Sequence, residues 1–265
     1  MSEPVKLSRD DRGVATLTFN RPEIHNAFDQ TIIAMLTDAF KQLNNDDAVR
    51  LVVITGAGKS FSAGADVRWM RAMAKYSRQE NVEDACRLAD MLHALNDSKK
   101  PTVARVNGHV FGGGVGILAC CDIVVASAKA RLALTEIRLG VLPAVISPYV
   151  IAAIGARQAR RLFLTGEALS AAKAAEIGLV HEVAEPDELD SVVESQVAML
   201  LKGGPSALAE AKSLINRVAG PDDDTRRDLR QATAEIIARL RASDEGQEGL
   251  GAFLDKRPPR WDKSQ

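Results

Sequence analysis

Cysteine is scarce in this chain of 265 residues, which contains only three. Cys120 and Cys121 stand next to each other in an apolar stretch, and Cys86 lies within a helical pattern. Three cysteines are too few for a disulfide scaffold, and the cysteine and histidine spacings match no zinc motif. We therefore expect reduced structural thiols and no metal site.

Aromatic residues and an excess of basic charge are also lacking. Phe, Trp and Tyr make up 4% of the chain, and 34 Lys and Arg face 35 Asp and Glu, giving a formal net charge of −1. A nucleic-acid-binding protein usually carries a concentrated basic face, together with aromatic rings that stack on bases. The composition therefore argues against a nucleic-acid partner.

Long hydrophobic runs are absent as well. No window of about 18 residues is apolar throughout, as a membrane-spanning helix requires. The N-terminal MSEPVKLSRDDRG lacks the apolar core of a signal peptide. We therefore expect a cytoplasmic protein with no membrane association. The content of 46% hydrophobic and 26% charged residues is ordinary for a globular chain of one or two domains.

Strand and helix patterns alternate along the first two-thirds of the chain, which predicts an α/β fold. Residues 14–20 alternate apolar and polar side chains, whereas residues 51–55 form the short apolar run of a strand buried in a parallel sheet. After about Ser147 the pattern becomes mostly helical. The expected strands are 14–20, 51–55, 102–106 and 123–127, and the expected helices are 30–43, 80–97, 147–155, 156–164, 170–177, 186–201, 204–217 and 222–242.

Two glycine-bearing segments each follow a predicted strand. They are SAGAD, Ser62 to Asp66, and FGGGVG, Phe111 to Gly116. Glycine lets the backbone approach a ligand closely, and a helix that starts just afterwards presents unpaired N–H groups. Two such groups aimed at one point would form an oxyanion hole for a carbonyl oxygen. Neither segment matches the dinucleotide GxGxxG or the phosphate loop GxxxxGK[ST], so no nucleotide cofactor is indicated.

Glu136 is the carboxylate that the pattern singles out for acid–base chemistry. It stands in LALTEIRLG between apolar residues, where desolvation would raise its pKa toward the range useful for proton transfer. An edge position facing solvent is the alternative. The four histidines are scattered and lie near no GxSxG or HExxH motif, which argues against a hydrolase triad or a zinc site.

The order of the segments along the chain is similar to that of the enoyl-CoA hydratase/isomerase (crotonase) superfamily. The resemblance rests on RPEIHNAFD, FSAGAD, NGHVFGGGVG, CDIVVAS, LTEIRLGVLP and LTGEALSAAKAAEIGLV, and it extends through the tail DEGQEGLGAFLDKRPPRW. It implies a spiral of ββα units over residues 1–200 and a C-terminal helical region over residues 201–265. It also implies acyl-CoA as the partner and a homo-oligomer, either a trimer or a dimer of trimers.

The resemblance also assigns roles to individual residues. It places the two oxyanion-hole N–H groups on Ala65 and Gly113, and the catalytic carboxylate on Glu136. Coenzyme A is then part of the substrate rather than a separate cofactor. Arg68 falls near the expected CoA phosphates, and Lys256 falls where a neighbouring subunit's lysine reaches the nucleotide. The residues expected to contact the thioester or CoA are Ala63, Ala65, Asp66, Val67, Arg68, Gly113 and Lys256.

Gly116 departs from the family pattern, because hydratases of the family carry a second glutamate at this position. A missing side chain can neither hold water nor move a proton, so an isomerase with Glu136 as its single acid is one alternative. A non-catalytic acyl-CoA-binding homologue is another.

The stretch EIRLGVLPAVISPYVIAAIGARQARRLFLTGE resembles the bacterial branch that hydrates 3-methylglutaconyl-CoA and related glutaconyl thioesters, in which glycine at position 116 is usual. The leading hypothesis is therefore hydration of a branched or carboxylated enoyl-CoA, as in leucine degradation. Glu136 would activate the water, and His109, Arg138, Tyr149 or the substrate's own distal carboxylate would complete the proton transfer.

Overall fold

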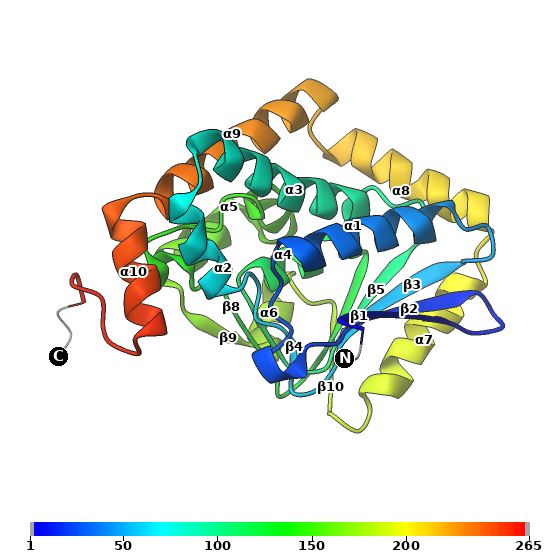
Figure 1. Cartoon of the computed structure of the whole chain (residues 1–265). Coiled ribbons are helices and arrows are strands. Elements are labelled where there is room, and N and C mark those ends of the chain that lie inside the picture. Colours follow the sequence, from blue (N-terminus) through cyan, green and yellow to red (C-terminus); the bar gives the residue numbers. More distant parts are fainter. Residues whose placement is uncertain (1–2, 263–265) are drawn as a thin grey trace.

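The computed structural model describes residues 3–262, whose strands form two sheets (Figure 1). Neighbouring strands are parallel except for the first pair of the larger sheet and the last pair of the smaller one. In spatial order, the larger sheet contains β1 (Val5–Arg9), β2 (Val14–Phe19), β3 (Leu51–Gly56), β5 (Thr102–Val106), β7 (Ile123–Ser127) and β10 (Glu182–Ala184). The smaller sheet contains β4 (Ser60–Ser62), β6 (His109–Phe111), β8 (Arg131–Ala133) and β9 (Ala168–Ser170).

Successive strands alternate between the two sheets. The chain passes from β3 to β4, from β5 to β6 and from β7 to β8, and each step moves from the larger sheet to the smaller. A helix follows β4 and β6 directly, so each unit reads strand, strand, helix. This repetition is the predicted spiral of ββα units, and the predicted α/β fold is confirmed.

The helices cover both faces of the larger sheet (Figure 1). They are α1 (Gln30–Asn45), α2 (Val67–Ala72), α3 (Arg78–Asn96), α4 (Gly113–Cys120), α5 (Ser147–Thr165), α6 (Ala171–Glu176), α7 (Leu189–Leu201), α8 (Pro205–Ala219), α9 (Asp223–Arg241) and α10 (Asp244–Leu254), with short 3-10 turns η1 (Pro22–Ile24), η2 (Met73–Lys75) and η3 (Glu136–Leu139). No helix of residues 3–262 combines the length and apolarity needed to span a membrane.

The strand β3 shows why its first four residues, 51–54, are all apolar. Val52 and Ile54 point into the main core, whereas Leu51 and Val53 point to the opposite face, which α7 covers. Side chains of a strand alternate between faces, so a strand covered on both sides needs apolar residues at every position. The three cysteines are reduced and buried, as predicted.

Helix starts and ends follow local capping. Asp29 caps α1 by accepting hydrogen bonds from the N–H groups of Thr31 and Ile32. Ser77 and Glu80 form a capping box, which starts α3 two residues before the predicted position 80. Gly155 has a φ of 73° and divides α5, so the predicted pair of helices, 147–155 and 156–164, is confirmed.

The sequence pattern does not predict α10. Its three glycines have low helical propensity, yet close packing requires two of them. A Cβ on Gly246 would lie 2.0 Å from the carbonyl oxygen of Leu240, and a Cβ on Gly249 would lie 2.4 Å from the backbone of Leu139. The tight approach of α10 to its neighbours therefore overrides local propensity.

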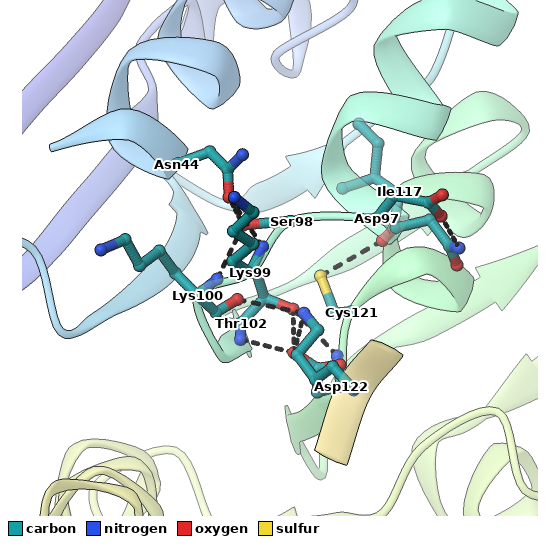
Figure 2. A network of polar contacts seen from close by, with 11 residues as sticks. Asn44, Asp97, Ser98, Lys99, Lys100, Thr102, Ile117, Cys121 and Asp122 are labelled. Carbon is teal, nitrogen blue, oxygen red and sulfur yellow. Dashed lines mark hydrogen bonds and ion pairs between the residues drawn. The ribbon is translucent and has the colours of Figure 1, made fainter. Parts of the chain in front are cut away.

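A polar network surrounds Thr102 of the larger sheet and Asp122 (Figure 2), and Lys212 of α8 joins it. Asp122 Oδ2 accepts hydrogen bonds from the N–H of Thr102 at 2.7 Å, from Thr102 Oγ1 at 2.8 Å and from Lys212 Nζ at 2.6 Å. Lys212 Nζ also donates to the carbonyl of Lys100 at 3.0 Å. Lys212 therefore links the C-terminal helices to the spiral. The boundary between the spiral region and the C-terminal region, expected at residue 200, stays a prediction.

Candidate active site

Three neighbouring strands of the smaller sheet bring the candidate residues together. The strands β4, β6 and β8 are parallel and adjacent in this order, and β6 lies in the middle. Ala65 follows β4, Gly113 follows β6 and Glu136 follows β8. Adjacent strands are about 4.8 Å apart, and parallel strands end at the same edge of a sheet. The topology therefore places Gly113 between Ala65 and Glu136.

The backbone N–H of Ala65 faces away from its neighbouring strand segment. Phe28 and Ala65 form a parallel β-bridge, in which the N–H of Phe28 donates to Gly64 O and the N–H of Asp66 donates to Phe28 O, each at 2.9 Å. In extended backbone, successive N–H groups point to opposite sides. The N–H of Ala65 therefore points away from Phe28, and the described residues supply it with no acceptor.

Gly113 approaches this segment closely. A Cβ on Gly64 would lie 2.8 Å from the nitrogen of Gly113 and 2.6 Å from the carbonyl oxygen of Phe111. Gly113 is also the first residue of α4, and the first N–H groups of a helix have no partner inside the helix. Two free N–H groups thus stand on neighbouring segments, at the positive end of a helix dipole.

RPEIHNAFD, which the sequence alone left without a role, holds these two segments in place. The buried Asn26 donates from Nδ2 to the carbonyls of Ala57 and Ser60, and Ser62 Oγ donates to Asn26 O while accepting from the N–H of Gly64. The ring of Phe28 packs against Gly113, because a Cβ there would lie 2.6 Å from Phe28 Cζ. Phe28 thus touches both segments.

Glu136 begins η3, and its carboxyl group lies against the glycine loop. A Cβ on Gly112 would be 3.1 Å from Glu136 Oε1, and the φ of Gly112 is 52°, a conformation that favours glycine. Within residues 3–262 the buried Oε2 has no hydrogen-bond partner. Burial raises the pKa of Glu136 from 4.5 to about 7. The carboxyl group can therefore exchange a proton near neutral pH.

The side chain of Ile146 fills the space beside Gly116, the position at which the resemblance places the second glutamate of the hydratases. A Cβ on Gly116 would lie 2.3 Å from Ile146 Cγ2 and 2.7 Å from Ile146 Cβ. Gly113 and Gly116 are three residues apart in α4 and share one face of the helix. Ile146, on the segment before α5, therefore closes this part of the site with an apolar group.

The candidate partners for proton transfer are not joined to Glu136. His109 is exposed at the start of β6, whereas Gly112 follows its end. Burial raises the pKa of Tyr149, whose neighbours include Asp97 and the Cys120 thiol at the far end of α4. Arg138 is exposed on η3, with its Nε beside Gly166. None of the three forms a hydrogen bond with Glu136 in the described part of the chain.

The residues expected to contact CoA lie around the start of α2. Asp66 caps this helix by accepting from the N–H of Arg68 at 2.8 Å, and Val67 is its first residue. The N–H of Ala63 is held by the carbonyl of His25. The side chain of Arg68 is exposed, so it is free to meet a phosphate.

Lys256 follows the end of α10 in a left-handed conformation, with a φ of 54°. In this chain α10 packs against α2 and η3 of the same molecule. Helix α10, which ends two residues before Lys256, therefore packs within one chain on the elements that carry Arg68 and Glu136, and the predicted contact of Lys256 with the CoA of a neighbouring subunit stays a prediction.

The geometry also identifies residues that the sequence reading missed. Phe28 and Ile146 contact Gly113 and Gly116 of α4, but their side chains are ordinary core residues by type. The available signal was a glycine in an otherwise apolar helix. A position without a side chain leaves room that a large neighbouring residue can fill.

Comparison with known proteins agrees with this architecture. The family model described as enoyl-CoA hydratase/isomerase matches residues 9–264. A crotonyl-CoA hydratase of Syntrophomonas wolfei is 31% identical over 257 residues, covering 96% of each chain. A solved enoyl-CoA hydratase of Mycobacterium avium superposes with a TM-score of 0.85 and 37% identity, covering 98% of this chain and 100% of that one. The chain belongs to the enoyl-CoA hydratase/isomerase, or crotonase, family.

The family contains more than one reaction. A trans-2-decenoyl-[acyl-carrier-protein] isomerase of Streptococcus mutans is also 31% identical, over 257 residues and 95% of each chain. Sequence identity therefore does not separate hydration from isomerisation, and the choice depends on the residues of the site.

Proposed function

We propose that this protein is an enoyl-CoA hydratase that adds water across the α,β double bond of a branched or carboxylated enoyl-CoA. The single observation that carries the proposal is the position of the buried Glu136 carboxyl group beside the glycine loop. Its pKa of about 7 suits a group that takes and returns a proton at neutral pH.

The N–H groups of Ala65 and Gly113 form the oxyanion hole of this proposal. Addition of hydroxide to the β-carbon moves negative charge onto the thioester oxygen, giving an enolate. Two preorganised donors stabilise that charge more than they stabilise the neutral carbonyl, which lowers the barrier. The absence of another acceptor for the Ala65 N–H, within residues 3–262, supports this role.

Glu136 acts as the base in the ionised form and activates the attacking water. The proton must then reach the α-carbon, and Glu136 is the one carboxyl group that the proposal provides for it. His109, Arg138, Tyr149 and the substrate's distal carboxylate stay alternatives for a second proton-handling group.

Isomerisation of a β,γ-enoyl-CoA is the second candidate, and one contact favours it. Because Ile146 fills the space next to Gly116, the site holds an apolar group where a two-carboxylate hydratase would hold water. A single base can remove a proton from the α-carbon and return it to the γ-carbon without any water. Glu136 would then be the only proton carrier.

The CoA portion is proposed to run past α2, with Arg68 and Lys256 near its phosphates and Ala63, Asp66 and Val67 lining its path. The exposed Arg68 side chain and the packing of α10 on α2 support this placement. CoA enters as part of the substrate.

The test is the absorbance of the conjugated thioester with a panel of enoyl-CoAs that includes 3-methylglutaconyl-CoA. Hydration removes this band, isomerisation of a β,γ-enoyl-CoA creates it, and a protein that only binds acyl-CoA changes neither. We expect loss of the band with an α,β-enoyl-CoA. Glu136→Gln should lower kcat by about 10²- to 10⁴-fold, the usual contribution of a general acid–base group.

The pH profile provides a control for the role of Glu136. Because the base must be ionised, kcat/KM should fall as the pH drops below about 7. Asp38→Asn, which removes an exposed carboxylate on α1 away from the site, should keep this profile. Full activity of Glu136→Gln would contradict the mechanism. If the absorbance band changed with none of the thioesters, the remaining alternative would be a non-catalytic homologue that binds acyl-CoA.

A further inference from the structure

Phe28 contacts the two segments that carry the proposed oxyanion donors, and it does so in two different ways. Its backbone pairs with the first segment through the bridge to Ala65, where its N–H donates to Gly64 O and its carbonyl accepts from the N–H of Asp66. Its ring packs against the second segment at Gly113, the first residue of α4. One residue, completely buried within the described chain, therefore connects the two donors.

The end of the Phe28 ring, rather than its face, meets Gly113. A Cβ on Gly113 would lie 2.6 Å from Phe28 Cζ, 3.3 Å from Cε2 and 3.7 Å from Cε1. The ring atom farthest from the backbone of Phe28 is thus the one nearest to this position. Because an aromatic ring cannot bend, its length sets how closely the start of α4 approaches the segment that contains Ala65.

The backbone of Phe28 is held on both sides. Arg21 Nη1 donates to Ala27 O at 3.1 Å and to Asp29 Oδ2 at 3.0 Å, so one guanidinium group joins the residues before and after Phe28. Asp29 also caps α1, which connects this segment to the start of a helix of 16 residues. The ring therefore projects from a fixed backbone position and acts as a rigid spacer.

Contact with the backbone of a glycine distinguishes Phe28 from an ordinary core residue. Core side chains pack against other side chains, and a hydrophobic substitution that keeps their volume usually costs little. The tip of the Phe28 ring meets a backbone position that has no room for a methyl group. The length of this side chain is therefore constrained in both directions. A shorter one would leave a gap beside Gly113, and a longer one would displace the start of α4.

The separation of the two donors matters because both must reach the same oxygen atom. Hydrogen bonds weaken steeply when their distance or angle departs from the favoured range. The thioester oxygen carries more negative charge in the enolate than in the bound substrate. A displaced donor therefore destabilises the transition state more than the substrate complex. A change in the length of residue 28 should accordingly appear mainly in kcat rather than in KM.

We propose that Phe28 is a positioning residue, whose ring sets the separation of the Ala65 and Gly113 N–H groups and thereby the strength of the oxyanion hole. This inference rests on the proposed function, since it concerns the hole that the function requires. Phe28 acts through the two backbone donors and touches none of the reacting atoms, and Glu136 keeps the proton transfer.

The first experiment shortens and lengthens the side chain. Phe28→Leu removes the tip of the ring, and Phe28→Tyr adds a hydroxyl group at Cζ, the atom that faces Gly113. Each should lower kcat by about 10- to 100-fold, the cost of small displacements in a catalytic site, while KM changes by less than about threefold. The fall of kcat/KM below about pH 7 should persist, because Glu136 is unchanged. A loss confined to KM would overturn the proposal.

Phe40→Leu is the matched control. Phe40 is a buried phenylalanine of α1 in the same hydrophobic core, and the substitution removes the same atoms. It should keep the kcat of the wild type, and an equal loss of kcat would assign the effect to core packing and overturn the proposal. Phe28→Met, which retains more volume, is measured in place of a Phe28 variant that does not fold.

The second experiment observes the oxyanion hole without turnover. Butanoyl-CoA is saturated, so it can be neither hydrated nor isomerised, and hydrogen bonds to its thioester carbonyl lower the carbonyl stretching frequency. Infrared difference spectra with a carbon-13 label at this carbonyl therefore report how well the two N–H groups are placed. In Phe28→Leu we expect the frequency to move toward that of free butanoyl-CoA, whereas Phe40→Leu should keep the frequency of the wild type.

Gly113→Ala tests the contact from the other side. In the wild-type chain the added methyl group would meet Phe28 Cζ, so kcat should fall. Measured in the Phe28→Leu background, the same substitution should cost at least about fivefold less in kcat, because the tip of the ring is absent. Equal losses in the two backgrounds would show that the contact does not set the position of Gly113, and they would overturn the proposal.

The outcomes also separate this inference from the proposed function. Hydration of enoyl-CoAs by a protein whose Phe28 variants keep the wild-type kcat and carbonyl frequency would remove the Phe28 proposal alone. A carbonyl frequency that shifts in Phe28→Leu but not in Phe40→Leu, in a protein without hydratase activity, would reject the function and keep the positioning role.

Discussion

At the scale of single residues, burial of the Glu136 carboxyl group affects the free energy of unfolding as well as the proposed chemistry. The pKa of Glu136 rises from 4.5 to about 7 in the folded protein because its carboxyl group is buried. Between these values the folded protein binds more protons than the unfolded chain, so stability decreases as the pH rises through this window. At pH values above this window the carboxylate is ionised in both states, and its burial then lowers the free energy of unfolding by the full amount.

The first prediction follows from this linkage. Glu136→Gln should be more stable than the wild type at pH 8, by roughly 2–3 kcal/mol, and nearly equal to it at pH 4.5. Denaturant unfolding at several pH values measures the difference. A variant whose stability follows that of the wild type across this range would show that the carboxyl group is not desolvated.

The second residue-scale prediction concerns the contact of Gly116 with Ile146. A methyl group at position 116 would lie 2.3 Å from Ile146 Cγ2, so Gly116→Ala should destabilise the protein by about 1–3 kcal/mol despite the higher helical propensity of alanine. Measured in an Ile146→Ala background, the same Gly116→Ala substitution should cost less, because the space is then free.

The matched control for this cycle is Gly251→Ala. Gly251 lies in α10, and nothing within 4 Å would meet its Cβ. It should be neutral or slightly stabilising, whereas an equally neutral Gly116→Ala would contradict the steric account.

At the scale of elements, α8 depends on polar anchoring because it contributes little to the core. The described structure buries none of its residues, and Lys212 reaches Asp122 and the carbonyl of Lys100. The side chain of Lys212 is 12% exposed and that of Asp122 is 31% exposed, so the pair lies between a surface and a buried ion pair.

Lys212→Met should therefore lower the free energy of unfolding by about 1–2 kcal/mol. Hydrogen exchange should increase first in α8, because the remaining core does not contain its residues. Lys202→Met, at an exposed position after α7, is the control and should change neither quantity. Unchanged exchange in α8 of the Lys212 variant would show that the bonds of Lys212 to Asp122 and Lys100 do not hold the helix.

At the scale of the whole molecule, α8 carries an apolar surface that one chain leaves uncovered. Leu214, Ile215 and Val218 are 60%, 63% and 77% exposed. These residues recur at helical spacing, so they form one stripe on the outside of the molecule. A stripe of this kind supports the expected trimer or dimer of trimers, in which neighbouring chains cover it.

The corresponding prediction is that Ile215→Glu with Val218→Glu converts the assembly to monomers, because buried unpaired carboxylates oppose association. Light scattering coupled to size exclusion gives the mass. Met199→Glu, at an apolar position on α7 that is 55% exposed, should keep the mass of the wild type. A wild-type monomer, or a variant of unchanged mass, would reject this surface as the interface.

The sequence by itself determined the local elements and the identity of the chemical groups. The periodicities of β2, β3, α1 and α9 are long enough to reveal both type and position, and the family motifs indicated Ala65, Gly113 and Glu136. The three-residue strands β4, β6 and β8 escaped prediction, because three residues carry too short a pattern to be recognised.

Only the tertiary structure decided what those groups can do. The order of β4, β6 and β8 places Gly113 between Ala65 and Glu136, and the bridge to Phe28 directs the Ala65 N–H. The contact of Gly116 with Ile146 likewise joins segments far apart in the sequence. Local patterns report only the face that a residue presents, whereas burial, pKa and unpaired donors depend on what packs against that face.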